Sequence, residues 1–457
     1  MNSLLRIPYA FAGLVTDAFV KVVPAGKSKF RRGLSSRRGL VARYERWASA
    51  SRDSARPLVW FHAPSVGEGL QALPVIELVH ARRPDAQIAY TFYSPSAEQF
   101  ARSLKVDFAD YLPFDTFDHA SAIVAALRPN ALVFSKLDIW PALTERAAAG
   151  GVHVGVISAT LPESSGRRGI LARAFLADAY RSIDRVGAID HKDAERLREQ
   201  GVRADRISVT GDTRFDQVWT RAQRTASPLV SQLRSSRPTL VAGSTWPSDE
   251  EHLLPVWIRI RDKIPDARLI IAPHETSSRH LRPIERWARA HALKLSRLDA
   301  ADASNADVLL VDRHGILGDL YSLADVAYVG GGFQSAGLHS VLEPAAFGAP
   351  VLFGPRNEKS REASKLVQAG GGAVVTGSAD LAIRLGDWLG SVAARDAAGA
   401  AAREMVQNGL GAAERSFALV TDCSAADRRR RMNRWPIRHA ACARPMDKES
   451  LYQMHAE

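Results

Sequence analysis

From Pro57 onward, short apolar runs alternate with longer stretches in which apolar and polar residues are mixed. The apolar runs predict strands at Leu58–His62, Ala86–Tyr90, Ala131–Phe134, Val152–Ser158, Arg185–Ile189 and Ile207–Thr210. The mixed stretches predict helices at Gly69–Arg82, Ser94–Leu104 and Pro141–Ala149. Strands that alternate with helices are typical of a parallel, doubly wound sheet.

A second series of the same kind follows a break in this rhythm. The polar segment Phe215–Arg237 has a helical character, and we interpret it as the connection between two domains. Beyond it, strands are predicted at Thr239–Ala242, Arg268–Ile271, Val308–Val311, Ala327–Val329 and Pro350–Phe353, with helices at Glu250–Lys263, Ser278–Ala290 and Gly318–Ala324. Two similar α/β halves predict a ligand site in the cleft between them.

The two ends of the chain differ from this pattern. Leu4–Val23 is apolar but contains two basic and one acidic residue, whereas a spanning helix needs about 20 predominantly apolar residues. Pro24 and a run of basic residues follow it, which favours a helix lying on an anionic membrane surface. The alternative is a helix packed on its own domain. We therefore expect a membrane-associated segment at 1–40, domains at 41–222 and 237–425, and a flexible tail at 428–457.

Composition narrows the class of protein. The chain has 457 residues, 46% of them hydrophobic, which is enough for two full cores. Cys423 and Cys442 are the only cysteines, so a disulfide framework is not expected. This cysteine content fits a protein in a reducing compartment. The net charge of +12 indicates an acidic partner. A recognisable nucleic-acid motif is lacking, so a membrane or a phosphorylated substrate is expected rather than nucleic acid.

The first candidate for chemistry is the segment 328–355, YVGGGFQSAGLHSVLEPAAFGAPVLFGP. It predicts a buried strand, a glycine run, a helix that begins near His339, and a second strand. Glycines allow a backbone to approach a ligand closely, and a helix N-terminus attracts an anion. Glu343, one turn into that helix, is in reach of a sugar hydroxyl. The segment therefore predicts a sugar-nucleotide site, although the glycines alone also fit an ordinary strand–turn–helix unit.

The second candidate is WFHAPSVGEGL at residues 60–70. A strand leads into a turn, and a helix is predicted to begin near Glu68. This places a carboxylate at the carboxyl end of the first strand, where open α/β sheets bind ligands. There it is positioned to take a proton from an acceptor hydroxyl. The alternative is that Glu68 only complements the helix dipole.

Both segments, in this order and in this two-half layout, resemble the 3-deoxy-D-manno-octulosonic acid (Kdo) transferase family. Further similar segments begin at Tyr93, Val209, Ala242 and Ala272. The resemblance covers roughly residues 29–419 and implies a GT-B fold, with two Rossmann-like domains facing a central cleft. It also implies transfer of Kdo from CMP-Kdo to a lipid A precursor, with inversion at the anomeric carbon. The family needs no metal ion or other cofactor, and an Asp-x-Asp pair is absent from the sequence.

The resemblance assigns roles to individual residues. Glu68 becomes the catalytic base, and Glu343 the residue that holds a ribose hydroxyl of the cytidine. The expected donor-binding residues are Ser244, Thr245, His274, Gly331, Gly332, His339, Ser340 and Glu343. The expected acceptor-binding residues are Ser65, Gly67, Lys136 and Asp138.

Two departures from the family pattern bear on the substrates. Residues 135–141, SKLDIWP, stand where Glu-Thr-Glu-Leu-Trp-Pro is common, and Leu338-His339-Ser340 stands where Gly-His-Asn is frequent. Alternative functions are therefore a related GT-B enzyme for another nucleotide sugar, an epimerase included, or a non-catalytic scaffold of envelope assembly. The leading hypothesis remains a Kdo transferase on the cytoplasmic face of the inner membrane.

Overall fold

The computed structural model describes Tyr9, Gly13, Val20, Gly26 and residues 28–421, except 164, 225, 226 and 336. Apart from Tyr9, Gly13 and Val20, the predicted N-terminal helix therefore lies outside the described part of the chain. The predicted tail at 428–457 lies outside it entirely. Among the described residues, none of the helices combines the length and apolar character that crossing a bilayer requires.

The described chain forms two α/β domains, each built on a seven-stranded parallel sheet. The first sheet has the order β3-β2-β1-β4-β5-β6-β7 and the second β10-β11-β9-β8-β12-β13-β14. The strands of the first sheet are β1 Leu58–His62, β2 Gln87–Phe92, β3 Phe108–Tyr111, β4 Ala131–Ser135, β5 His153–Ala159, β6 Arg185–Ala188 and β7 Ile207–Val209. Those of the second are β8 Thr239–Thr245, β9 Arg268–Pro273, β10 Leu295–Arg297, β11 Val308–Leu310, β12 Val326–Val329, β13 Val351–Phe353 and β14 Gly372–Val374.

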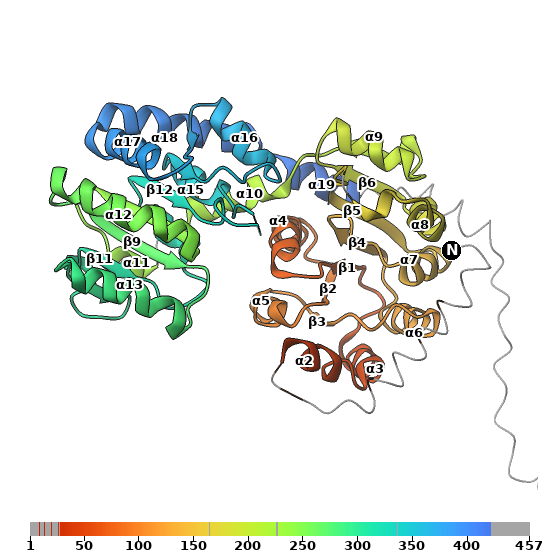
Figure 1. Cartoon of the computed structure of the whole chain (residues 1–457). Coiled ribbons are helices and arrows are strands. Elements are labelled where there is room, and N and C mark those ends of the chain that lie inside the picture. Colours follow the sequence, from red (N-terminus) through yellow and green to blue (C-terminus); the bar gives the residue numbers. More distant parts are fainter. Residues whose placement is uncertain are drawn as a thin grey trace, which may run out of the picture.

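Helices cover both faces of each sheet, as expected for strands whose residues are buried on both sides. In the first domain α3, α6, α7 and α8 lie on one face and α4, α5 and α19 on the other (Figure 1). In the second, α12, α13 and α17 cover one face and α14, α15, α16 and α18 the other. The helices of the first domain and the connection are α2 Lys29–Ser35, α3 Leu40–Ser51, α4 Val66–Arg82, α5 Glu98–Ser103, α6 Phe117–Leu127, α7 Pro141–Ala149, α8 Ile170–Ser182, α9 His191–Glu199, α10 Thr213–Gln223 and α11 Pro228–Gln232. The remainder are α12 Pro247–Lys263, α13 Ser278–Ala290, α14 Leu317–Leu320, α15 Leu342–Phe347, α16 Arg361–Gln368, α17 Ser378–Gly390, α18 Val392–Gln407 and α19 Ala412–Thr421, with short 3₁₀ turns η1 Pro95–Ala97, η2 Gly166–Arg168, η3 Ala204–Arg206, η4 Ala303–Asn305 and η5 Tyr321–Leu323.

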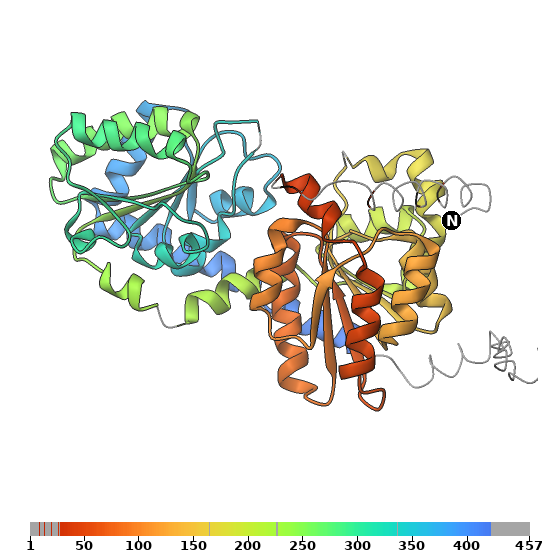
Figure 2. The same ribbon diagram turned by 90° about the horizontal axis from the view of Figure 1, so that it is seen from below.

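The two-domain α/β architecture predicted from the sequence is confirmed, and the expected domain boundary differs at the C-terminal end. After α18 the chain crosses back, and α19 packs on the first domain, where Ala413, Leu419 and Val420 join the core (Figures 1 and 2). Asp216 on α10 fixes this crossing by accepting hydrogen bonds from the N–H groups of Gly411 and Ala413 at 2.8 and 3.0 Å. The sequence alone does not indicate that α19 belongs to the first domain, because α19 is amphipathic like the neighbouring helices.

Ion pairs show how the two sheets face each other. Arg361, at the start of α16, follows the carboxyl end of β13 and binds Asp190 at 2.8 Å and also the buried Asp193. Both aspartates follow the carboxyl end of β6. The neighbouring Glu362 binds Arg214 on α10. Because these bonds join the carboxyl edge of one parallel sheet to that of the other, the two ligand-binding edges lie opposite one another.

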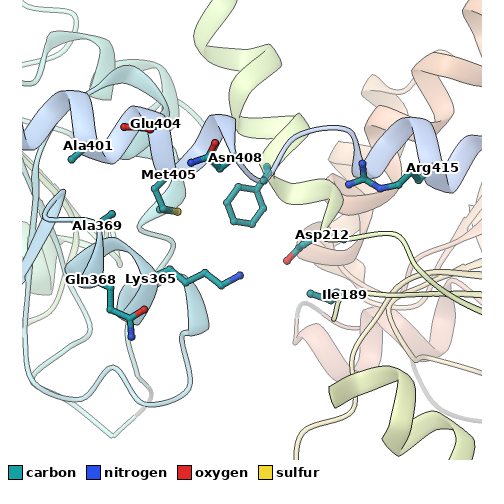
Figure 3. A pocket seen from close by; sticks show the side chains of 13 residues that line it. Ile189, Asp212, Lys365, Gln368, Ala369, Ala401, Glu404, Met405, Asn408 and Arg415 are labelled. Carbon is teal, nitrogen blue, oxygen red and sulfur yellow. The ribbon is translucent and has the colours of Figure 1, made fainter. Parts of the chain in front are cut away.

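A cavity of about 600 Å³ lies beside this junction. Figure 3 shows Lys365 and Gln368 on its second-domain wall, with Ile189, Asp212 and Arg415 on the first-domain side. None of the residues predicted for the donor, the acceptor or catalysis lines it. The cavity belongs to the junction between the domains rather than to the predicted site.

Candidate active site

The topology of the first sheet places Glu68 at a crevice. β1 lies between β2 and β4. After β1 the chain adds strands β2 and β3 on one side of β1, and it then crosses to add β4 on the other side. The segments that follow β1 and β4 therefore open away from each other at the carboxyl edge, which is where open α/β sheets bind ligands. Glu68 follows β1, and Lys136 and Asp138 follow β4.

The Glu68 carboxylate is held by two neighbours. Helix α4 begins at Val66, two residues before the predicted start, so Glu68 lies in its first turn. The Ser65 hydroxyl donates to Glu68 Oε2, and Lys136 Nζ lies 3.4 Å from Oε1. Burial raises the pKa of the Glu68 carboxyl, but the Ser65 hydrogen bond and the Lys136 charge outweigh it and leave the pKa below its ordinary value. The carboxylate is therefore ionised and remains 18% exposed.

Of the other predicted acceptor residues, Lys136 has an unusual backbone conformation, and the Asp138 carboxylate is hydrogen-bonded to two protein side chains. Lys136 has φ +63°, a left-handed value that turns the chain sharply out of β4. Asp138 accepts hydrogen bonds from Arg167 at 3.0 Å and from the Trp140 indole at 3.2 Å. At Gly67 a Cβ atom would have only the Ser65 hydroxyl within 4 Å, so the fold itself leaves room for a larger residue there.

Sequence reasoning missed a buried network beneath this crevice. The Trp140 indole donates to His62 Nε2 at 3.0 Å, and His62 Nδ1 meets the Thr91 hydroxyl at 2.9 Å. Burial lowers the pKa of His62 to about 3, so the ring is neutral. Trp140 also stacks on Tyr93. These contacts fix the loop after β4, and the sequence signal for them is the aromatic residue at a strand end.

The second sheet has its own crevice, between the segments that follow β8 and β12, because β8 lies between β9 and β12. All eight predicted donor residues lie on or beside this edge. Ser244 and Thr245 are the last two residues of β8, and His274 follows β9. The other five follow β12: Gly331, Gly332, His339, Ser340 and Glu343.

A stack of three rings forms the centre of this second crevice. The Trp246 and His274 rings lie 4.5 Å apart, and the His274 and His339 rings 4.6 Å apart, both nearly parallel. The Trp246 indole donates to His339 Nε2 at 3.3 Å, which leaves Nδ1 as the protonated nitrogen. Burial lowers the pKa of His339 to about 4 and also lowers that of His274. Two neutral imidazoles therefore stand at the carboxyl edge.

Buried carboxylates hold the loops of this crevice in place. Asp249, fully buried in the first turn of α12, accepts hydrogen bonds from the N–H groups of Gly331 at 2.8 Å and Trp246 at 2.9 Å. The Tyr328 hydroxyl donates to the same carboxylate at 3.1 Å. Gly331 has φ +93°, and a Cβ there would lie 2.3 Å from the carbonyl oxygen of Gly337, so this position requires glycine. Asp249 was absent from the predicted site, although an acidic residue in the first turn of a helix is a recognisable signal.

Three details of the donor side differ from expectation. The helix predicted to begin near His339 begins at Leu342, so His339 and Ser340 lie in the preceding loop. The Thr245 hydroxyl donates to Glu250 at 2.9 Å and points into the protein. Glu343 lies 3.9 Å from Arg221 on α10, and burial raises the pKa of its carboxyl despite that charge. The loop after β12 extends further than the sequence predicts, because its glycines and small polar residues form no hydrophobic pattern that would mark where the helix begins.

Two cavities flank the ring stack. The larger, of about 430 Å³, is lined by Ser244, His274 and the loop Arg313–Gly315 that follows β11. The smaller, of about 190 Å³, lies among the His339–Ser340 loop, Lys359 and Arg214. The sequence prediction omitted Arg313, Lys359 and Arg214. Among the described residues, no group of three His, Cys, Asp or Glu side chains is arranged to hold a metal ion.

Glu250 supplies a stability test. Burial raises its pKa to about 7, above the ordinary 4.5. Between these values the folded protein keeps a proton that the unfolded chain releases, so the stability contributed by this group is present below about pH 4.5 and is lost as the pH rises toward 7. Glu250→Gln is therefore expected to raise the free energy of unfolding by about 1–3 kcal/mol at pH 8 and far less at pH 5. Urea denaturation at both pH values measures this, and an equal change at both would contradict it.

Comparisons with known proteins agree with this arrangement. A family profile described as 3-Deoxy-D-manno-octulosonic-acid transferase (kdotransferase) matches residues 34–217. The 3-deoxy-D-manno-octulosonic acid transferase of Chlamydophila psittaci is 30% identical over 331 residues, which cover 69% of this chain and 74% of the relative. The chain belongs to the Kdo transferase family.

Another relative and a solved structure are also similar to this chain. The 3-deoxy-D-manno-octulosonic acid transferase of Rickettsia felis is 27% identical over 316 residues, covering 68% of this chain and 67% of the relative. In fold, the Kdo transferase chain is similar to the UDP-GlcNAc 2-epimerase of Neisseria meningitidis, with a TM-score of 0.57 and 14% identity over 80% of this chain and 98% of that one. At that identity the likeness concerns the fold alone. Membership of the Kdo transferase family makes the protein a glycosyltransferase.

Proposed function

We propose that this glycosyltransferase transfers Kdo from CMP-Kdo to a lipid A precursor, with inversion at the anomeric carbon. The observation that carries the proposal is the ionised Glu68 carboxylate at the carboxyl edge of the first sheet, opposite the loops of the second. Family membership supports the same reaction. We further propose that it acts at the cytoplasmic face of the inner membrane, where a lipid precursor would be met.

In the proposed reaction Glu68 accepts the proton of the acceptor hydroxyl as the new bond forms between that oxygen and the anomeric carbon. The bond from the anomeric carbon to the phosphate oxygen breaks, and CMP leaves with the bonding electrons. Negative charge therefore grows on the departing phosphate, and groups that bind it more strongly as it grows lower the barrier. The neutral His339, through its Nδ1–H, and the cations Lys359 and Arg214 are the groups best suited to that role.

Glu343 and the cavity beside His274 are assigned to the nucleotide. Glu343 is a partly buried carboxyl in the first turn of α15, which follows the loop after β12, and is suited to accept a hydrogen bond from a ribose hydroxyl. The cavity lined by Ser244, His274 and Arg313–Gly315 is of a size that fits a pyrimidine with its sugar. The stacked rings of Trp246, His274 and His339 form the boundary between this cavity and the one beside Lys359.

Lys136 tunes the proposed base, and its removal gives a second test. Without the ammonium 3.4 Å from Oε1, the pKa of Glu68 is expected to rise, because the charge that favours the carboxylate is gone. Lys136→Met is therefore expected to move the acid limb of the kcat/KM profile to higher pH. Initial rates measured between pH 5 and pH 9 report this, and Lys105→Met, an exposed lysine after α5, serves as the control. A profile that falls uniformly at every pH would assign Lys136 to acceptor binding alone.

The donor is tested by offering alternatives. Purified protein is incubated with a lipid A precursor and, in separate reactions, with CMP-Kdo generated in situ, CMP-N-acetylneuraminate and UDP-N-acetylglucosamine, and nucleotide release is followed by chromatography. Acceptor-dependent release of CMP from CMP-Kdo alone is the expected result. Release of UDP instead would favour a related enzyme for another nucleotide sugar. Release from none of the three would favour a non-catalytic scaffold.

A further inference from the structure

Arg361 joins the two domains through three groups of the first domain. Its guanidinium donates to the Asp190 carboxylate at 2.8 Å and to the Thr160 hydroxyl at 3.4 Å, and both of its terminal nitrogens bind the Asp193 carboxylate. Thr160 directly follows β5, and the two aspartates lie at the start of α9, after β6. The contact therefore connects the N-terminus of α16 with the carboxyl edge of the first sheet.

The burial of Asp193 distinguishes this ion pair from an ordinary surface pair. An exposed ion pair contributes little to stability, because water screens both charges. Asp193 is fully buried, so its carboxylate depends on protein groups to balance its charge. Arg361 is in direct contact with it, whereas Arg196 lies 3.7 Å away. The pairing therefore favours one fixed position for the Arg361 side chain and for the backbone that carries it.

The residues beside Arg361 line the cavity assigned to the departing phosphate, which has a volume of about 190 Å³. Lys359 and Glu362 both belong to the wall of this cavity. Glu362 also binds Arg214 on α10, the second cation of that wall. The segment 359–362 thus carries one of the cations proposed to bind the phosphate and contacts the other.

The loop that carries Lys359 is held by polar contacts alone, since none of the residues 355–360 is buried. Lys359 itself is exposed and forms no ion pair with another described residue. At the first end of the loop, the N–H group of Arg356 donates to the carbonyl oxygen of Gly332 at 2.9 Å. At the other end stands Arg361. A segment with few buried contacts opens at a low free-energy cost, so the Arg361 contact is important for the position of Lys359.

We propose that Arg361 is a positioning residue for the transfer reaction: by binding the carboxylates at the start of α9, it holds Lys359 and Arg214 beside the donor phosphate. The inference rests on the proposed function, since it takes the cavity next to His339 as the phosphate site. Arg361 does not line that cavity, so it acts through its neighbours and not by contact with the donor. Its charge also offsets two carboxylates at the edge that faces the donor, and these would otherwise repel an anionic nucleotide.

The test measures CMP binding to variants of the full chain by calorimetric titration. Arg361→Gln removes the charge, and Arg361→Lys keeps it on an ammonium that lacks the fork geometry needed to contact both carboxylates. Asp190→Asn removes one partner on the other domain, and asparagine still caps α9. Arg361→Gln is expected to weaken CMP binding about five- to fiftyfold and Asp190→Asn about two- to tenfold. Arg361→Lys is expected to lie between wild type and Arg361→Gln.

Arg43→Gln is the matched control. The Arg43 side chain is 32% exposed, against 36% for Arg361, and binds Asp110 at 2.7 Å within the first domain. This variant is expected to bind CMP like wild type. The double variant Arg361→Gln with Asp190→Asn is expected to bind CMP within about twofold of Arg361→Gln alone, because both substitutions break the same contact.

Steady-state kinetics separate positioning from a loss of folded protein. Arg361→Gln is expected to raise KM for CMP-Kdo and to lower kcat, while KM for the lipid acceptor stays unchanged. A smaller amount of folded enzyme would lower the apparent kcat alone and would leave both KM values and the CMP affinity as in wild type. If Arg361→Gln does not fold, the comparison of Asp190→Asn with Arg43→Gln decides the proposal in the same way.

Several outcomes would overturn the proposal. These are unchanged CMP affinity in Arg361→Gln, an equal loss in Arg43→Gln, or additive losses in the double variant, which would show that Arg361 and Asp190 act separately. Wild-type protein that does not bind CMP would contradict both the positioning role and the donor assignment. CMP binding that depends on Arg361 in a protein that transfers nothing supports the positioning role and contradicts the proposed reaction.

Discussion

Replacing Glu68 by glutamine is expected to lower the rate of Kdo transfer by about 10²–10⁴-fold while CMP-Kdo binding stays close to that of wild type. The amide keeps the size of the side chain and accepts the Ser65 hydrogen bond, but it is not basic enough to take the acceptor proton. Donor binding is spared because the donor residues lie on the second domain. Initial rates from quenched transfer reactions, with calorimetric titration of CMP, measure the two effects separately.

Glu45→Gln is the matched control for this variant. Glu45 is an exposed carboxylate on α3 of the same domain, and its replacement removes the same charge without touching the crevice. It is expected to leave both rate and affinity unchanged. Full activity in the Glu68→Gln enzyme would contradict the assignment of Glu68 as the base. A parallel loss of rate and CMP affinity would indicate that Glu68 has a structural role.

Replacing Asp249 by alanine is expected to lower the free energy of unfolding by about 2–5 kcal/mol and to weaken CMP binding at least about tenfold. The carboxylate is fully buried and is the acceptor for the N–H groups of Gly331 and Trp246 and for the Tyr328 hydroxyl. Its loss leaves buried donors without a partner, and each such group costs about 1–3 kcal/mol. It also frees the loop after β12 from the loop after β8, so the donor site loses its preorganised shape.

Urea denaturation and calorimetric titration of CMP test this expectation. Asp262→Ala, an exposed position near the end of the same helix α12, is the control and is expected to change neither quantity measurably. An Asp249→Ala protein with wild-type stability would show that the two loops are fixed by other contacts. Lowered stability with unchanged CMP affinity would remove the loops after β8 and β12 from the donor site.

The sequence predicted the two-sheet architecture because buried parallel strands leave the strongest pattern in a chain. Leu58–His62, Ala131–Ser135 and Val351–Phe353 are continuous apolar runs, and each is a strand within one residue of its predicted bounds. The short edge strands β3, β10 and β14 were missed, since edge positions bury fewer side chains. Helix α19 was placed in the wrong domain, because its packing on the first sheet is decided by contacts far apart in the sequence.

The site was predictable as a set of strand ends but not as a set of contacts. Glu68, His274 and the glycine run after β12 lie at carboxyl ends of parallel strands, which the sequence indicates. The ring stack of Trp246, His274 and His339 is not visible in the sequence, because its members come from three separate loops. The pairing of Lys136 with Glu68 likewise depends on the left-handed turn after β4.

The most direct measurement is the mass of the lipid product. Purified protein is incubated with CMP-Kdo generated in situ and a tetra-acylated lipid A precursor, beside Glu68→Gln and Glu45→Gln, and the lipids are analysed by mass spectrometry. The account predicts a product heavier by one or more Kdo units with wild type and Glu45→Gln, and little or none with Glu68→Gln. An unmodified precursor with folded wild-type protein that binds the donor, or equal product from Glu68→Gln, would contradict it.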